Sequence, residues 1–201
     1  MNPIDKLTEL FKEFPGIGPR QAKRFVYFLL LKNQGYVNEL ASLIPEIKKS
    51  ITVCDACFRY FPKNESQTNT CKICLDKNRD SSLLMVVSRD TDFDAVQKSH
   101  QFKGYYFILG GIVPVMEDNH QKFIRLRELK EEIGKRKQNG LQEVILALNA
   151  TTEGDFTTDL LKKELKDFDI KISILGRGLS TGTELEYSDK ETILNALNNR
   201  K

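Results

Sequence analysis

Four cysteines in two close pairs constrain the fold of this chain more than any other feature of its sequence. They follow the spacing Cys54-x2-Cys57, thirteen residues, then Cys71-x2-Cys74. Two residues between paired cysteines allow both thiolates to bind one ion, and two such pairs complete a tetrahedral shell of four sulfurs. A closed shell leaves no position for water, so the spacing predicts a structural zinc ion. An iron–sulfur cluster uses the same ligand type, and free thiols or a redox-active pair are the remaining alternatives.

The expected compartment also favours metal binding over disulfide bonds. The N-terminal sequence MNPIDKLTELFKEF alternates apolar and charged residues and lacks the apolar core of a signal peptide. No apolar run reaches the roughly 18 residues that a membrane-spanning helix needs. We therefore expect a cytoplasmic protein with no membrane partner, in which thiols stay reduced.

The 201 residues fall into three segments that predict a multidomain α+β protein. Residues 1–50 are expected to form a helical helix–hairpin–helix region. Residues 51–80 are expected to be a small four-cysteine zinc module, which cannot build a core alone and so needs a metal. Residues 81–201 are expected to form an α/β domain with a mostly parallel sheet and a C-terminal helix.

Three helices are predicted in residues 1–50, because apolar residues recur there at helical spacing. Pro15 ends the first helix, and Pro19 can begin the second at its first turn. Pro45 is expected to kink the third helix or to split it in two. The apolar residues of the third helix that are expected to face inward are Val37, Leu40, Ala41, Ile44 and Ile47.

Short apolar runs alternate with helical stretches through residues 81–201. The predicted strands are 83–88, 105–109, 143–148 and 171–175, and the predicted helices are 92–99, about 121–138, 156–167 and about 189–199. The strands are almost entirely apolar, as in a parallel sheet covered on both faces. Ligand sites in such sheets lie beyond the carboxyl ends of the strands. The segments that follow the first three strands are therefore candidate sites.

The sequence FPGIGPR joins the first two predicted helices by a very short turn. Gly16 and Gly18 permit close approach of a ligand to the backbone, and the N–H groups that begin the next helix suit phosphate. Arg20, Lys23 and Arg24 follow at three- and four-residue spacing, so they can share one helix face. The hairpin therefore predicts contact with the DNA backbone without base reading. The alternative is a solvated basic helix.

Acidic residues follow the third predicted strand. Glu153 and Asp155 stand at the start of a helix. Carboxylates in this position can hold Mg²⁺, but they also cap a helix and complement its dipole. The capping interpretation is favoured over catalysis, because the first strand ends in Ser88, where a phosphoryl-transfer site would usually add a carboxylate.

The order of these parts resembles the RecR recombination-mediator family over nearly the full chain. The resemblance rests on the hairpin PGIGPRQAKRF, the four-cysteine module, the acidic segment TTEGDFTT and the C-terminal sequence ILGRGLSTGTELEYSDKETILNAL. The α/β segment is similar to a Toprim domain. The stretch GRGLSTGTELEY resembles the glycine-containing segment of the family near its C-terminus.

The resemblance implies a non-enzymatic role in DNA repair and recombination, in the cytoplasm of a bacterium and on its nucleoid. Family members help recombinase to replace single-strand-binding protein on damaged DNA, together with the partner proteins RecO and RecF. They assemble into ring-shaped tetramers that can encircle DNA, and their hairpin regions help the subunits to join. The DNA-contacting basic positions of the family match Arg20 and Arg24, and helical spacing adds Lys23.

The sequence departs from the family where the first Toprim strand ends, with Ser88 in place of a glutamate. Asp92 still matches an acidic family position. Asp92, Glu153 and Asp155 are therefore a candidate site for weak Mg²⁺ binding or for partner docking. The alternative function is a Mg²⁺-dependent Toprim nuclease or another phosphotransferase, and the absent glutamate argues against it. A scaffold that never touches nucleic acid is a third interpretation.

Overall fold

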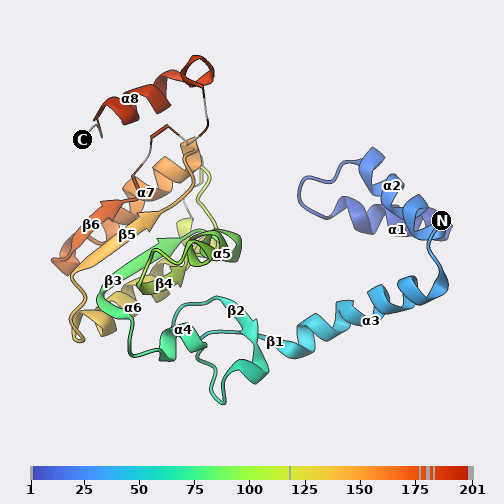
Figure 1. Cartoon of the computed structure of the whole chain (residues 1–201), viewed down its shortest axis with the longest axis horizontal. Helices are drawn as coiled ribbons and strands as arrows, with labels where there is room; N and C mark the ends of the chain where they lie inside the picture. Colours follow the sequence, from blue (N-terminus) through green and yellow to red (C-terminus); the bar gives the residue numbers. More distant parts are fainter. Residues whose placement is uncertain (1, 118, 177, 180–181, 183, 199–201) are drawn as a thin grey trace. The chain divides into compact units, whose positions relative to one another are not determined.

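A computed structural model describes residues 2–117, 119–176, 178–179, 182 and 184–198 (Figure 1). The chain divides into two compact units, Met1–Thr52 and Val53–Lys201. Among the described helices, none combines the length and the apolar character that crossing a membrane requires. The three domain boundaries expected from the sequence stay a prediction.

Three helices build the N-terminal unit: α1 (Pro3–Lys12), α2 (Pro19–Leu30) and α3 (Gln34–Ser50). The side chain of Asn2 accepts a hydrogen bond from the N–H of Asp5 at the start of α1, at 2.9 Å. Asn33 caps α3 in the same way. Pro19 stands in the first turn of α2, where a missing N–H costs no helical hydrogen bond. The helical N-terminal region predicted from the sequence is confirmed.

The hairpin of α1 and α2 has a small apolar interior. Ala22 and Val26 are buried, whereas Phe25 is 36% exposed and Phe14 is 57% exposed. The ring of Phe11 packs edge-on against that of Phe25, with 5.8 Å between the ring centroids. Much of the apolar surface of this unit therefore stays in contact with solvent.

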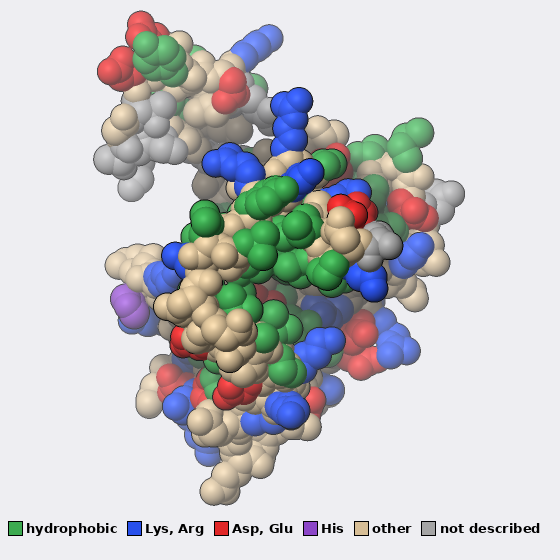
Figure 2. All heavy atoms as spheres, turned by 90° about the vertical axis from the view of Figure 1, so that its right-hand side faces the viewer, with side chains coloured by type: hydrophobic (Ala, Val, Ile, Leu, Met, Phe, Trp, Pro, Cys, Tyr) green, Lys and Arg blue, Asp and Glu red, His purple; other side chains and the backbone are tan. Residues whose placement is uncertain are grey.

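α3 differs from the sequence prediction in two respects. It continues through Pro45 as a single helix, so the helix is not split there, and a kink at Pro45 stays a prediction. The prediction that its apolar residues face inward holds only in part within the described unit, because Val37 is half-buried and no residue of α3 is fully buried. Leu40, Ile44 and Ile47 are 36%, 62% and 60% exposed. Helical spacing identifies an apolar face, but it does not identify what covers that face. Figure 2 shows exposed hydrophobic side chains beside lysine and arginine.

The four-cysteine module is made of short elements. Strands β1 (Ile51–Val53) and β2 (Tyr60–Pro62) form a two-stranded sheet, followed by the 3-10 turn η1 (Lys63–Glu65) and the short helix α4 (Lys72–Leu75). Its buried interior consists of three of the cysteines and Phe61. An interior this small agrees with the expectation that the module needs a metal to hold it together.

A four-stranded parallel sheet with the order β4-β3-β5-β6 forms the centre of the larger unit. Its strands are β3 (Asp80–Val87), β4 (Gly104–Ile108), β5 (Glu143–Ala147) and β6 (Lys171–Ile174). The longer helices are α5 (Asp90–Ser99), α6 (Leu126–Lys137), α7 (Thr152–Glu164) and α8 (Lys190–Asn198), and the 3-10 turns are η2 (His120–Lys122), η3 (Lys166–Phe168) and η4 (Leu185–Tyr187). This arrangement confirms the predicted parallel α/β domain.

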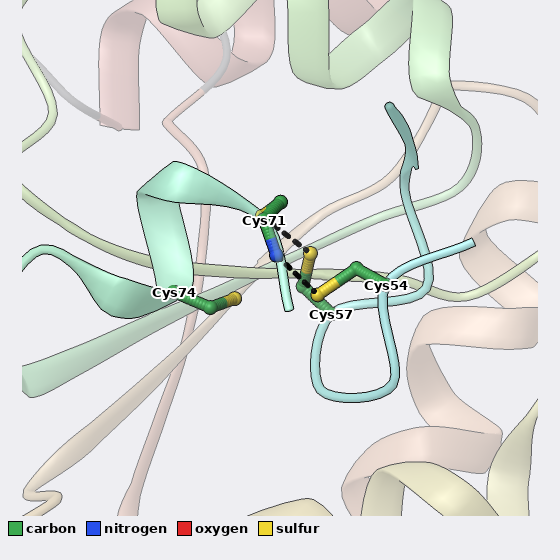
Figure 3. A group of neighbouring side chains, drawn as sticks. All are labelled: Cys54, Cys57, Cys71 and Cys74. Carbon is green, nitrogen blue, oxygen red and sulfur yellow. Dashed lines mark hydrogen bonds between the residues drawn. The ribbon is translucent and has the colours of Figure 1, made fainter. Parts of the chain in front are cut away.

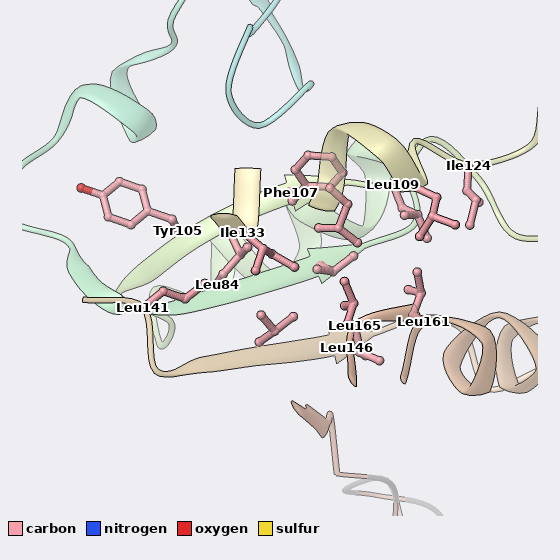
Figure 4. Packing of buried hydrophobic residues seen from close by; sticks show 14 of the residues in the cluster. Leu84, Tyr105, Phe107, Leu109, Ile124, Ile133, Leu141, Leu146, Leu161 and Leu165 are labelled. Atoms are coloured by element: carbon pink, nitrogen blue, oxygen red, sulfur yellow. The ribbon is translucent and has the colours of Figure 1, made fainter. Parts of the chain in front are cut away.

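Alternate residues of the central strands enter two apolar clusters, one on each face of the sheet. On one face Leu84, Phe107 and Leu146 pack with side chains of α6 and α7, including Ile133 and Leu161 (Figure 4). On the other face, β3 and β4 residues pack against Phe93 of α5. Coverage on both faces explains why the sequences of β3, β4 and β5 are nearly all apolar.

Candidate metal centre and nucleic-acid interface

The four cysteines converge in space, as their spacing predicts. Cys54 and Cys57 lie in the turn between β1 and β2, and Cys71 and Cys74 lie at the start of α4 and within it (Figure 3). All four sulfur atoms lie within 4.8 Å of one another, and the sulfurs of Cys57 and Cys71 are 3.7 Å apart. Four sulfurs each about 2.3 Å from one zinc ion would stand about 3.8 Å apart. The donor set therefore suits a tetrahedral metal, and all four cysteines are free of disulfide bonds.

Backbone hydrogen bonds hold each cysteine pair in its turn. The N–H of Phe58 donates to the carbonyl of Cys54, and the N–H of Cys54 donates to the carbonyl of Arg59, both at 2.9 Å. Phe58 adopts a left-handed conformation with φ of 61°, which reverses the chain after Cys57. The second pair is joined to the first because the N–H of Cys71 approaches the Cys54 sulfur at 3.4 Å.

The thiols influence one another electrostatically. A hydrogen bond with Cys57 lowers the pKa of Cys54, and the same interaction raises the pKa of Cys57. Closely packed thiols can share a first negative charge, but each further ionisation is opposed by the charge already present. A bound divalent cation removes this obstacle, because it stabilises every thiolate that coordinates it.

Arg59 is a residue of this site that cysteine spacing does not reveal. Its guanidinium pairs with Glu65 at 2.8 Å, and both side chains are mostly buried, at 13% and 15% exposed. Burial alone would lower the pKa of Arg59, but Cys71, Glu65 and Cys57 together raise it above its ordinary value. Since four thiolates and one divalent ion carry a net charge of minus two, a buried guanidinium offsets part of that charge. No sequence signal identifies this contact, because it depends on how the turn folds.

The hairpin between α1 and α2 presents an open backbone. Gly16 has φ of +76°, a conformation that favours glycine, and no atom lies within 4 Å of where a Cβ would stand on Gly16 or Gly18. Gly18 precedes α2 and offers no side-chain cap. The first helical hydrogen bond at this end runs from the N–H of Ala22 to the carbonyl of Gly18, at 2.9 Å. The amide groups that begin α2 are therefore available to a ligand.

The three basic residues predicted to contact DNA all lie on α2. Arg20, Lys23 and Arg24 are exposed. No described carboxylate forms an ion pair with any of them. The sequence of α2, PRQAKRFVYFLL, contains no acidic residue. The positive charge at this helix end is therefore not neutralised within its own element, which suits an anionic partner.

Asp92, Glu153 and Asp155, the predicted acidic site, are all described residues, and they do not form a group placed to hold one metal ion. The carboxylate of Asp92 accepts a hydrogen bond from the N–H of Arg89 at 3.0 Å and so caps α5. Glu153 is exposed and Asp155 is half-buried in the first turn of α7. Within the described part of the chain, the cysteines form the only group of three or more residues placed to hold one metal ion. A weak Mg²⁺ or docking site at these acidic residues stays a prediction.

Ser88 directly follows β3, at the carboxyl edge of the sheet. It is buried, and its carbonyl accepts a hydrogen bond from the N–H of Gly110 at 2.9 Å. Its hydroxyl has no hydrogen-bond partner among the described residues. A neutral hydroxyl at this position supplies no carboxylate for a metal. The glycine-containing stretch 176–187 lies partly outside the described residues.

Three family models match successive stretches of the chain. The model for the RecR helix–hairpin–helix matches residues 4–47, and the model for the Toprim domain matches residues 82–176. The model for the RecR C-terminal region matches residues 178–201. These matches follow the same order as the helical region and the parallel sheet of the structure.

Curated relatives match the chain almost from end to end. The recombination protein RecR of Gloeobacter violaceus is 34% identical over 99% of this chain and 97% of its own length. The RecR protein of Bifidobacterium adolescentis is 34% identical over 98% of this chain and 95% of its own length. The RecR protein of Streptococcus uberis is 33% identical over 98% of this chain and 96% of its own length. Identity of this extent, together with the matched hairpin, sheet and C-terminal region, shows that the chain belongs to the RecR family of recombination proteins.

Proposed function

We propose that this chain is a DNA-binding recombination mediator that acts in DNA repair and is not an enzyme. Its relatives named recombination protein RecR support this role, because they match it over nearly its full length. The observation that carries the proposal is the exposed start of α2. There Arg20, Lys23 and Arg24 face solvent without a described carboxylate partner.

The hairpin binds the sugar–phosphate chain through its backbone and its basic side chains. Gly16 and Gly18 leave room for a phosphate to approach the amide groups at the start of α2. Arg20, Lys23 and Arg24 add charge-assisted contacts from the first turns of the helix. Contacts of this type position DNA without reading its sequence.

A structural zinc ion bound by Cys54, Cys57, Cys71 and Cys74 holds the four-cysteine module together. The sulfur separations and the cationic Arg59 beside them support zinc at this site. With four sulfur ligands the ion has no open position for water or substrate, so it contributes folding energy rather than chemistry.

Several copies of the chain form a ring-like clamp, as a dimer or a tetramer, that helps to load recombinase onto DNA coated with single-strand-binding protein. RecO and RecF are the proposed partners, and Asp92, Glu153 and Asp155 are the proposed docking or weak Mg²⁺ site. The exposed residues Leu40, Ile44 and Ile47 form an apolar stripe on α3. This stripe supports contact between copies, since a lone unit leaves it in solvent. A ring needs few phosphate contacts per subunit, because linkage multiplies weak affinities.

Charge reversal at the hairpin tests the DNA contact. We expect the double variant Arg20→Glu and Arg24→Glu to lose most of its affinity for labelled DNA, measured by fluorescence anisotropy. The slope of log affinity against log salt should also fall by about two, one for each lost phosphate contact. The matched control, Lys162→Glu with Lys163→Glu on α7, changes net charge equally and should bind almost as the wild type does. Equal affinity and slope in the hairpin variant would contradict the proposal.

A cleavage assay tests the alternative enzyme function. Under the mediator proposal, the pure protein leaves labelled DNA intact in the presence of Mg²⁺. Metal-dependent cleavage that disappears in Glu153→Ala would instead establish a Toprim nuclease.

A further inference from the structure

Beyond its basic start, α2 carries a row of exposed aromatic and cationic side chains that the proposed phosphate contacts leave unused. Arg24 and Phe28 are four residues apart in α2, which places them on one face of the helix, and Lys32 follows the C-cap Leu31 with its ammonium over the Phe28 ring. Tyr36, in the first turn of α3, packs beside them. Phe28 is 46% exposed and Tyr36 is 41% exposed, so both rings reach solvent. We name Phe28, Lys32 and Tyr36 the aromatic row, and Arg24 adjoins it.

The contacts within the aromatic row hold both rings in place. Phe28 and Tyr36 meet edge-on, with 6.2 Å between their ring centroids and an angle of 84° between their planes. The Lys32 ammonium lies over both rings, 4.5 Å from the centroid of Phe28 and 5.5 Å from that of Tyr36. A groove with a volume of about 320 Å³ adjoins them and is lined by Gln21, Arg24, Phe25 and Phe28. The rings are therefore ordered and lie next to a guanidinium, and a base can stack only on a ring face that Lys32 leaves uncovered.

The positive charges beside the two rings favour a negatively charged partner. No described carboxylate forms an ion pair with Arg24 or Lys32, so the row is suited to a polyanion. A symmetric contact of this patch with its own copy would bring two Arg24 and two Lys32 side chains into one interface with no carboxylate from the patch, since an isologous interface uses one patch twice. Duplex DNA offers phosphates but keeps its base faces stacked. Unpaired bases present a flat π-face to an aromatic ring, and stacking of this kind tolerates any sequence.

We propose that the aromatic row stacks unpaired bases of single-stranded DNA while Arg20 and Arg24 hold the adjoining phosphates. The proposal rests on the DNA-binding function proposed above and specifies the form of DNA that the hairpin region prefers. The strand runs from the start of α2 toward Phe28 and Tyr36.

Substitution of one ring separates base stacking from phosphate binding. The full-length Phe28→Leu variant keeps an apolar side chain and loses the ring. Its affinity is measured by fluorescence anisotropy for an oligothymidine strand, an abasic strand of equal length and a duplex. We expect a loss of roughly fivefold or more for oligothymidine, and no change for the abasic strand or the duplex. Tyr36→Leu should act in the same direction, and Tyr60→Leu, which removes an exposed ring from the four-cysteine module, should change none of the three affinities.

Other outcomes of these measurements overturn the proposal. Unchanged oligothymidine affinity, or an equal loss for the abasic strand, excludes base stacking by the row. A smaller molecular mass in light scattering with unchanged affinity per subunit would assign the row to contact between copies. The double variant Arg20→Glu and Arg24→Glu reports separately on DNA binding itself. If it loses binding to all three DNAs and Phe28→Leu loses none, only the stacking proposal fails.

A cross-linking measurement on the wild-type protein tests the same proposal without relying on variants that have to fold correctly. An oligonucleotide that carries a photoreactive halogenated uracil forms a cross-link to an aromatic ring stacked on it. We expect the adduct on Phe28 or Tyr36 after proteolysis and mass spectrometry. An adduct found only at other residues contradicts the proposal.

Discussion

The apolar runs of β3, β4 and β5 are largely buried, whereas in residues 1–52 equally regular apolar helices keep most of their large side chains exposed. The parallel sheet has an apolar cluster on each face, built from residues of a single chain. The N-terminal unit buries only Ala22 and Val26 among its described hydrophobic residues. The sheet therefore owes its stability to its own packing, and the N-terminal unit retains surface for partners.

The four-cysteine module differs from both regions, because a cluster of four cysteines in a metal-binding arrangement takes the place of an apolar core. The largest effect is therefore expected for Cys57→Ser, which removes one of four ligands from a fully buried position. Structural zinc binding is coupled to folding and is worth on the order of 10 kcal/mol. Elemental analysis should show near-complete loss of metal, and the melting temperature should fall.

Ala56→Ser is the matched control for the metal prediction. It changes a half-buried residue between the first two cysteines and leaves all four sulfurs in place, so it should retain the metal. Full metal content in Cys57→Ser would show that the fourth ligand is dispensable. An absence of zinc and iron from carefully prepared wild-type protein would refute the metal site altogether.

Two isoleucine-to-alanine substitutions compare the sheet domain with the N-terminal unit directly. Ile133 on α6 is fully buried, and Ile44 on α3 is 62% exposed. Ile133→Ala should lower the free energy of unfolding by about 2–5 kcal/mol, because it leaves a cavity. Ile44→Ala should change the stability of an isolated subunit by only about 0.5 kcal/mol. Urea denaturation at low protein concentration measures both values.

Light scattering tests whether α3 joins copies of the chain. If α3 joins copies of the chain, Ile44→Ala should lower the average mass at a given concentration, whereas Ile133→Ala should not at temperatures where it stays folded. Equal destabilisation by both substitutions, with no change in mass, would mean that the stripe of α3 is covered within its own subunit.

The sequence predicts a feature well where that feature depends on local spacing. The cysteine pairs are close because two intervening residues bring the thiols together, and the strands are recognisable because burial on both faces demands continuous apolar runs. Element ends are less predictable. α7 begins at Thr152 rather than at residue 156, because the Thr151 side chain accepts a hydrogen bond from the N–H of Gly154. α6 begins only at Leu126, after a separate 3-10 turn.

Features that depend on contacts between distant residues could not be predicted from the sequence. Arg59 meets Glu65 and the cysteine sulfurs only after the module has folded, and no spacing rule connects them. The apolar stripe of α3 is visible in the sequence, but periodicity cannot distinguish a face buried within a subunit from one available to a partner. The same limit applies to Phe28 and Tyr36, whose contact joins two helices.

The smallest expected effect concerns an ion pair on the sheet domain. Lys130 on α6 approaches Glu164 on α7 at 2.5 Å, and its hydrogen bond lowers the pKa of the Glu164 carboxyl. Because the pKa of Glu164 is lower in the folded protein than in the unfolded one, the stabilisation is present above the unfolded value of about 4.3 and is lost as pH falls through the folded value.

Partly exposed ion pairs contribute about 0.2–1 kcal/mol, so Glu164→Gln should lower the free energy of unfolding by this amount at neutral pH and by almost nothing in acid. Glu131→Gln removes a longer pair, 3.7 Å from Arg127, and should lower the unfolding free energy less than Glu164→Gln does at neutral pH. A Glu164→Gln effect that persists unchanged in acid would mean that packing, not charge, joins the two helices there.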